Sequence, residues 1–70
     1  MNQNAFRIYC LRQGVSLKDV ANHIDVDYAT LSRKLNGKSD FYRHEMQAIR
    51  EFLNLTADEA DEIFFGQKLT

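Results

Sequence analysis

The chain has 70 residues, of which 44% are hydrophobic and 27% charged, and its formal net charge is −1. A domain of this size buries about 60% of its unfolded surface, which leaves no room for both a core and a deep substrate cleft. A single cysteine excludes an internal disulfide framework, and no apolar run approaches the roughly 20 residues of a membrane span, so we expect a soluble intracellular domain that is not an enzyme.

Charge is divided unevenly along the chain. Residues 1–38 hold six basic and three acidic residues, a net charge of +3, whereas residues 39–70 hold three basic and seven acidic residues, a net charge of −4. A basic half favours an anionic partner, although mixed charge on a solvated surface is the ordinary interpretation. By itself the division is weak evidence.

Two helices are predicted in the first third of the chain. The apolar residues Phe6, Tyr9 and Cys10 recur at helical spacing, and Gly14 fits the residue that follows a helix C-terminus. Ser16 and Asp19 resemble a capping box that begins the second helix. The apolar stripe of this second helix comprises Leu17, Val20, Ala21 and Ile24.

A short polar break precedes the third predicted helix. Asp25 is expected to adopt the left-handed conformation that glycine takes at lower cost, and Asp27 is a good N-cap. The third helix is predicted over residues 28–35, with Gly37 just beyond its end.

The remaining signals are also helical. A fourth helix is predicted over residues 43–53, and a fifth begins at Thr56, where Glu59 completes a capping box. The inward residues are Met46, Ile49 and Leu53 in the fourth helix and Ala60, Ile63 and Phe64 in the fifth. Strand alternation is nowhere sustained, so the sequence predicts an all-α domain of five short helices around one core.

Residues 16–36 fit a helix-turn-helix. Ala21 is small where the second helix of the pair crosses over the first, and Val26 is apolar where the turn must be pinned. Leu31 is placed to fill the space between the two helices. Helix pairs of this kind also occur in domains with no role on DNA.

The same segment resembles the Cro/repressor-type (XRE-like) helix-turn-helix domains. The most specific parts are Ala21, Leu31-Ser32-Arg33 and Asn36-Gly37-Lys38. Residues 35–41 and 63–69 are similar to short transcriptional regulators of bacteriophages and prophages. Over the whole chain, the resemblance implies a single five-helix, lambda-repressor-like domain that binds operator DNA, commonly as a dimer.

Four features depart from the family pattern. Leu17 stands where members often place a Gln that contacts the DNA backbone, and Asp25 stands where they often have Gly. Cys10 and Leu35 occupy positions where many members pair an Arg with a Glu, so we expect an apolar contact there. Lys34 occupies a usually apolar position, and we expect its stem to cover the core while its charge reaches solvent.

Candidate DNA contacts follow from placing residues 28–35 in the major groove. Arg33 is suited to guanine O6 and N7, Ala29 to a thymine methyl, and Tyr28 to a base or a phosphate, with an ordinary surface role as the alternative. The base-contact candidates are Tyr28, Ala29, Ser32 and Arg33. The phosphate-contact candidates are Ser16, Thr30, Asn36, Lys38 and Arg43, with Arg7 as a further flanking residue.

No catalytic or metal site is predicted. Cys10, His23 and His44 lack the spacing of a zinc site or of a nucleophile with its base. Cys10 lies on the inward stripe, which favours a buried structural cysteine, and both histidines are expected at the surface. We therefore expect no cofactor.

The end of the chain is unusually apolar. One helix face cannot bury both Phe64 and Phe65 in so small a core. One of them, together with Leu69, either packs on the first helix or forms a subunit interface. We favour the interface, and Phe64, Phe65 and Leu69 are its candidates.

Two functional hypotheses result. The first is a phage-type DNA-binding transcriptional regulator, acting as a repressor and as a homodimer on a pseudo-palindromic operator. It would work in the cytoplasm of a bacterial host, at the nucleoid, with no membrane partner and no small-molecule effector. The alternative is a protein–protein interaction module on the same fold without DNA binding, which the net charge of −1 and Leu17 favour.

Overall fold

The computed structural model describes residues 1–66, which form five α-helices and no strand. The helices are α1 (Gln3–Gln13), α2 (Leu17–His23), α3 (Tyr28–Leu35), α4 (Arg43–Phe52) and α5 (Ala57–Phe65). The expected all-α class is therefore confirmed for this part of the chain. The third helix has the bounds predicted for it, and the fourth ends one residue earlier than predicted. None of the helices in residues 1–66 is both long enough and apolar enough to cross a bilayer.

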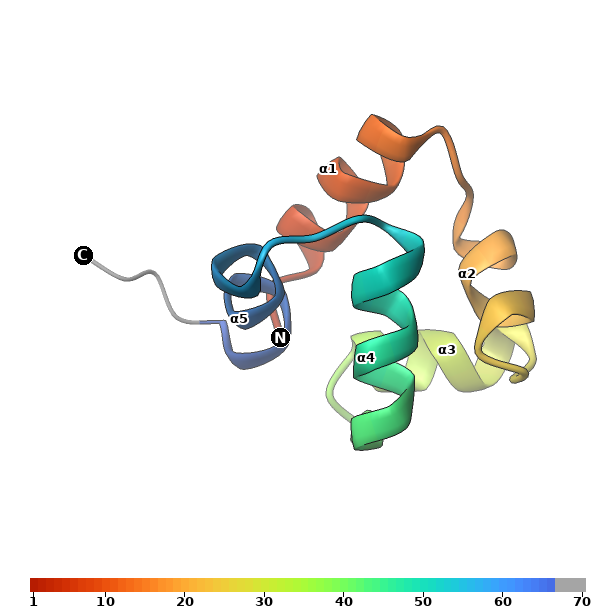
Figure 1. The fold of residues 1–70 in the computed structure, drawn as a ribbon. Coiled ribbons are helices and arrows are strands. Elements are labelled where there is room, and N and C mark those ends of the chain that lie inside the picture. Colours follow the sequence, from red (N-terminus) through yellow and green to blue (C-terminus); the bar gives the residue numbers. More distant parts are fainter. Residues whose placement is uncertain (67–70) are drawn as a thin grey trace.

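The helices pack in two groups joined by α4. Helix α2 packs against α3 and α4, while α5 packs against α1 and α4. Figure 1 shows α4 in the middle, with α2 on one side and α5 on the other. The N-terminus lies beside α5, because the Asn2 N–H donates to the Ile63 carbonyl at 2.8 Å. The beginning of the chain is thereby held against its last helix.

Local capping signals set the helix starts as predicted. The Ser16 N–H donates to the Asp19 carboxylate at 2.9 Å, and the Asp19 N–H donates to the Ser16 hydroxyl at 3.1 Å. The Asp27 carboxylate accepts from the Thr30 N–H at 2.7 Å. Asp25 has φ of 61°, the left-handed conformation expected of it. These bonds satisfy helix N–H groups that have no partner within the helix.

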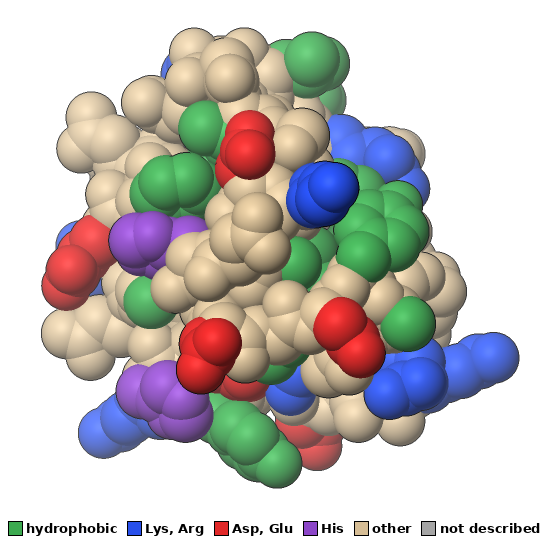
Figure 2. Space-filling model, turned by 90° about the vertical axis from the view of Figure 1, so that its right-hand side faces the viewer, with side chains coloured by type: hydrophobic (Ala, Val, Ile, Leu, Met, Phe, Trp, Pro, Cys, Tyr) green, Lys and Arg blue, Asp and Glu red, His purple; other side chains and the backbone are tan. Residues whose placement is uncertain are grey.

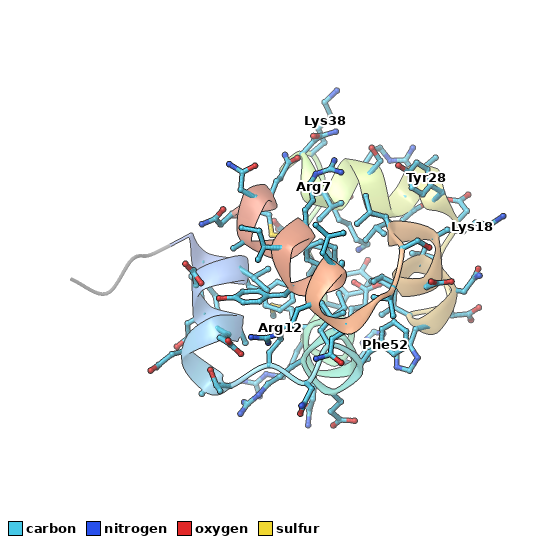
Figure 3. The ribbon with its side chains drawn as sticks, turned by 90° about the horizontal axis from the view of Figure 1, so that it is seen from above. Arg7, Arg12, Lys18, Tyr28, Lys38 and Phe52 are labelled. Carbon is cyan, nitrogen blue, oxygen red and sulfur yellow. The ribbon has the colours of Figure 1, made fainter. Side chains whose placement is uncertain are left out.

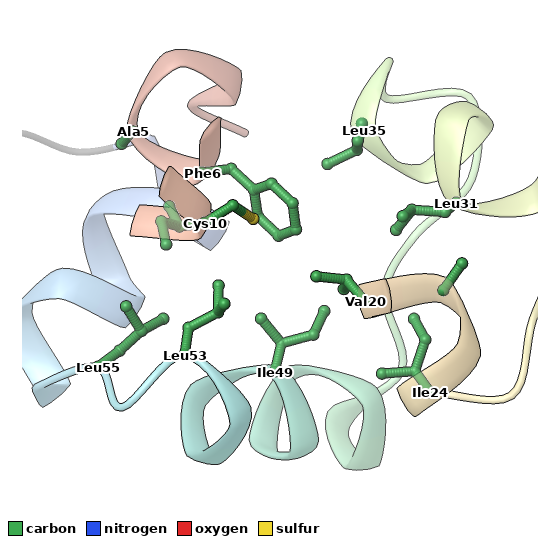
Figure 4. Packing of buried hydrophobic residues seen from close by; sticks show 12 residues of the cluster. Ala5, Phe6, Cys10, Val20, Ile24, Leu31, Leu35, Ile49, Leu53 and Leu55 are labelled. Carbon is green, nitrogen blue, oxygen red and sulfur yellow. The ribbon is translucent and has the colours of Figure 1, made fainter. Parts of the chain in front are cut away.

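The core gathers twelve buried apolar residues from all five helices and the segments that follow α2 and α4. Figure 4 shows how they meet between the helices: Ala5, Phe6, Cys10, Val20, Ala21, Ile24, Leu31, Leu35, Ile49, Leu53, Leu55 and Ile63. Five residues predicted to point inward are only half-buried, and Leu55 is buried without having been predicted. The five are Tyr9, Leu17, Met46, Ala60 and Phe64. Helical spacing gives no signal for Leu55, because it lies in a loop.

Cys10 is buried, as expected of a structural cysteine. Burial raises the pKa of its thiol to about 11, so the group stays protonated and unreactive near neutral pH. Cys10 and Leu35 belong to the same cluster, and in Figure 4 the ring of Phe6 lies between them. Both residues are therefore part of the apolar core, together with Phe6.

Lys34 differs from its prediction. Its side chain is 5% exposed, and Nζ lies 3.0 Å from the Glu45 carboxylate. The expectation that its charge reaches solvent is wrong, because Glu45 in the first turn of α4 and the Asp40 carbonyl, at 2.8 Å, replace the water. Sequence spacing on α3 alone does not reveal a partner on another helix.

Helices α1 and α5 are joined by polar contacts at the surface. Arg12 donates two hydrogen bonds to the Glu59 carboxylate, at 2.8 and 3.1 Å. The Tyr9 hydroxyl donates to Glu62 at 2.7 Å, and the Arg12 guanidinium lies 4.6 Å from the centre of the Tyr9 ring. Two of the acidic side chains of α5 are thereby directed toward α1.

Candidate nucleic-acid interface

The turn between α2 and α3 is held by a backbone hydrogen bond to α2 and by apolar packing against the core. Ala21 is buried, and its carbonyl accepts from the Val26 N–H at 3.0 Å. Val26 is half-buried against the core, and Leu31 is fully buried. The three requirements inferred from the sequence are met: a small residue at Ala21, an apolar pin at Val26 and a filled space at Leu31.

The outer face of α3 carries all four base-contact candidates. Tyr28 is 55% exposed, Ala29 and Arg33 are exposed, and Ser32 is half-buried. Leu31, Lys34 and Leu35 are buried beneath them. One side of a two-turn helix is therefore anchored in the core while the other presents an aromatic ring, a methyl group, a hydroxyl and a guanidinium to solvent.

The start of α1 borders this helix. A small hollow of about 30 Å³ has Gln3, Arg7, Leu17 and Tyr28 in its lining. The Gln3 side-chain amide donates to the Asn36 amide oxygen at 3.1 Å. Arg7 was expected only as a flanking residue and Gln3 not at all, because this contact joins positions 33 apart in the sequence and follows no local pattern.

Basic side chains surround α3. Arg7, Lys18, Arg33 and Lys38 are all exposed. In Figure 3, Arg7, Lys18, Tyr28 and Lys38 lie along one side of the molecule, away from Arg12 and Phe52. The space-filling view of the α2–α3 side shows Lys and Arg side chains along its right-hand edge (Figure 2). We term this surface the α3 face; it comprises Gln3, Arg7, Lys18, Tyr28, Ala29, Ser32, Arg33, Asn36 and Lys38.

Acidic groups near the α3 face are used in helix capping. A hydrogen bond from the Ser16 N–H holds the pKa of Asp19 below its ordinary value. Hydrogen bonds from Thr30 do the same for the pKa of Asp27. Both carboxylates therefore stay ionised at neutral pH, so the positive charge of the α3 face is moderate.

The phosphate-contact candidates do not all lie together. Asn36 and Lys38 are exposed on the α3 face. Thr30 is half-buried, and its hydroxyl accepts from the Arg33 guanidinium at 3.3 Å. Ser16 is exposed, and its hydroxyl accepts from the Asp19 N–H while keeping its own proton for donation. Arg43 instead lines a separate groove between α4 and α5.

That groove, the α4–α5 groove, is a hollow of about 600 Å³. Its lining includes Arg43, Arg50, Glu51, Asp61, Phe64 and Phe65. Phe64 is half-buried, and its ring meets that of Phe41 edge-on with the centroids 5.3 Å apart. Phe65 is 64% exposed, so Phe64 is the aromatic that packs inward. Leu69 lies outside the described residues.

The histidines lie at the surface, as expected. His23 is exposed and stacks on Phe52 with ring centroids 4.2 Å apart, and His44 is exposed beside Tyr42. Within residues 1–66, no three His, Cys, Asp or Glu side chains are close enough together to hold a metal ion.

Comparisons of the chain with protein-family models, curated proteins and solved structures find no match. Evidence for a function therefore comes from the geometry and charge of the α3 face.

Proposed function

We propose that this protein is a sequence-specific DNA-binding regulator, a repressor of phage type, in which α2 and α3 form a helix-turn-helix. The observation that carries the proposal is the α3 face: a helix anchored from below, open to solvent above and flanked by basic side chains. The major groove of B-DNA, about 12 Å wide, admits one α-helix, so a helix presented in this way fits it.

The α3 face supplies both kinds of contact that such binding needs. Arg33, Ala29 and Tyr28 project from the exposed side of α3, where they would meet base edges. Arg7, Lys18 and Lys38 flank the helix, where they would meet phosphates. Helix α5, with four acidic side chains, lies on the other side of α4 from α2, so its charge is directed away from the duplex (Figure 1).

Homodimer formation through the α4–α5 groove is part of this proposal. Phe65 is exposed at the edge of the groove, which is lined by two arginines, Arg43 and Arg50, and two acids, Glu51 and Asp61. In a twofold interface the same surface meets itself, so the acids of one copy would face the arginines of the other around the apolar group. This surface lies apart from the α3 face, which leaves α3 free for DNA.

Substitutions of Arg33 and Lys38 are expected to change DNA affinity in different ways. A duplex is first selected from a random pool with the wild-type protein, and binding is then measured on selected and random duplexes over a salt series. Arg33→Ala is expected to cost about 1–3 kcal/mol on the selected duplex only, because it removes a base contact. Lys38→Ala is expected to weaken binding to both duplexes and to lower the salt slope by about one unit, because it removes a phosphate contact.

Arg12→Gln is the matched control for loss of a positive charge, because Arg12 lies away from the α3 face (Figure 3). It is expected to bind both duplexes like wild type. If the wild type binds no duplex at low salt, the DNA-binding proposal fails, and the protein-interaction module takes its place with the α4–α5 groove as its surface. If the wild type binds but neither mutation changes binding, the placement of α3 in the groove is wrong.

A further inference from the structure

A buried ion pair joins the end of α3 to the start of α4. The Lys34 and Glu45 side chains are 5% and 4% exposed, and their charged atoms lie 3.0 Å apart. The other ion pair in residues 1–66, Arg12 with Glu59, is largely at the surface. A domain of this size has little interior, so a charge pair placed there calls for a physical reason.

Both charges are provided with further partners. The Lys34 ammonium donates to the Asp40 carbonyl at 2.8 Å and lies 4.5 Å from the centre of the Tyr42 ring. The Glu45 carboxylate accepts from the Tyr42 N–H at 2.8 Å. In the described part of the chain, every buried side-chain nitrogen or oxygen has a hydrogen-bond partner. The pair is therefore a completed polar network rather than a defect in packing.

Stability alone does not account for such a pair. Replacing a buried ion pair by apolar residues of similar volume is often neutral or stabilising, whereas removing one partner is strongly destabilising. What an ion pair adds is direction, because hydrogen bonds require a defined distance and angle while apolar burial does not. Helix α3 has only two other buried residues, Leu31 and Leu35, which lie one turn apart on the same line.

The pair also agrees with the polarity of both helices. Lys34 lies in the last turn of α3 and Glu45 in the first turn of α4. A cation near a helix C-terminus and an anion near a helix N-terminus are each favoured by the helix dipole. The pair therefore favours one arrangement of the end of α3 relative to the start of α4.

This arrangement controls the groups that are proposed to meet DNA. Arg33 precedes Lys34 directly, and its carbonyl accepts from the Lys38 N–H at 2.9 Å. Asp40, whose carbonyl binds the Lys34 ammonium, lies in the same connection as Lys38. A rotation of α3 about Leu31 and Leu35 would move both Arg33 and Lys38.

We propose that Lys34 and Glu45 are positioning residues for the α3 face: their buried ion pair fixes the rotation of α3 against α4 and thereby sets the preference for operator over random DNA. The inference rests on the proposed function. It extends that function to two residues that cannot touch DNA themselves, because both side chains are buried. If α3 is held loosely, preference for operator over random DNA is lost before overall affinity for DNA is lost. Base contacts depend on the exact placement of the helix, whereas attraction between basic side chains and phosphates does not.

The test replaces both charges together. The double variant Lys34→Met/Glu45→Gln leaves no unpaired charge, and the glutamine amide introduced at position 45 keeps an acceptor for the Tyr42 N–H. Its matched control, Arg12→Met/Glu59→Gln, removes the surface ion pair between α1 and α5. Affinities for the selected and random duplexes are measured at a temperature where circular dichroism shows each variant fully folded. Amide hydrogen exchange along α3 is measured without DNA.

For the Lys34/Glu45 double variant we expect the ratio of selected to random affinity to fall about tenfold, the effect of one mismatched base pair. Amide exchange in α3 is expected to rise about tenfold, because local opening becomes easier. Binding to random duplex stays near the wild-type value, and the control variant changes neither quantity. If the pair only stabilised the fold, its loss would lower the affinities for selected and random duplexes by the same factor, in proportion to the folded fraction.

A folded double variant with the wild-type affinity ratio and wild-type α3 exchange overturns the inference. If the double variant does not fold, Glu45→Asp is carried through the same two measurements, since it leaves no unpaired charge but shortens the reach of the carboxylate toward Lys34. If the wild type binds neither duplex, the proposed DNA function fails, and the exchange measurement alone decides whether the pair positions α3.

Discussion

Glu59 shows how strongly one side chain depends on its partners. Hydrogen bonds from Arg12, and then from the Thr56 N–H, lower its pKa from 4.5 to about 2. A carboxyl whose pKa is lower in the folded protein stabilises the fold fully above its ordinary pKa, and this contribution is lost as pH falls through the lower value. The window in which Glu59 contributes to acid unfolding is therefore about pH 4.5 to 2.

We expect Glu59→Gln to be less stable than wild type at neutral pH and to lose stability less steeply between pH 4.5 and 2. Urea unfolding followed by circular dichroism across this range measures the difference. Glu51→Gln, an exposed position on α4, is the control and should keep the wild-type slope. Identical slopes for Glu59→Gln and wild type would show that the contact with Arg12 does not persist in solution.

Residues whose partners are close in sequence were predictable, and residues whose partners are distant were not. The bonds between Ser16 and Asp19 and the burial of Cys10 follow from spacings of three and four positions. The position of Lys34 is unusual in the sequence, but its partner Glu45 belongs to another helix, so the prediction that its charge reaches solvent is wrong. The contact of Gln3 with Asn36 leaves no local signal at all.

At the level of elements, helix ends carry most of the information that the sequence provides. Gly14 follows α1 with φ of 68°, in the left-handed region that glycine tolerates and other residues avoid. The Thr56 and Glu59 capping box begins α5 as predicted. Asn54 also has positive φ, at 55°, which was not predicted because asparagine marks a helix end less strongly than glycine. Helix ends that are marked by capping residues or glycine were therefore predictable, while the packing of the helices required the structure.

Gly14 provides a test in which conformation is separated from packing. A Cβ added at this position has no other atom within 4 Å, so substitution introduces no clash. We expect Gly14→Ala to destabilise the protein by about 1–2 kcal/mol through the left-handed backbone alone. Thermal unfolding measures this, with Gln13→Ala in the preceding helical position as the control. Equal stability of the Gly14→Ala variant and wild type would mean that α1 ends differently in solution.

At the level of the whole molecule, basic side chains gather around α3 and acidic side chains gather on α5. The α3 face carries Arg7, Lys18, Arg33 and Lys38, whereas α5 carries four acids on the other side of α4 from α2. Two of those acids are engaged with α1, and Asp61 lines the α4–α5 groove. One small domain therefore has two surfaces of different chemistry, one for each partner of the proposed function.

Self-association is the property that tests this arrangement. Phe65 is 64% exposed, so Phe65→Ser leaves the core intact while removing the apolar group at the edge of the α4–α5 groove. We expect sedimentation equilibrium to show a dimer for wild type at raised concentration and a monomer for Phe65→Ser, because the interface loses its most exposed apolar side chain. A chain that ends at Phe64 should behave in the same way.

Leu11→Ser is the matched control, since Leu11 is the most exposed of the large apolar side chains on α1, at 79%. It is expected to dimerise like wild type, because α1 lies outside the groove. If Leu11→Ser is monomeric while Phe65→Ser remains a dimer, the interface lies on α1 and not at the α4–α5 groove. A wild-type chain that stays monomeric at every concentration would refute self-association of the free protein through this groove, and two copies would then meet only on DNA.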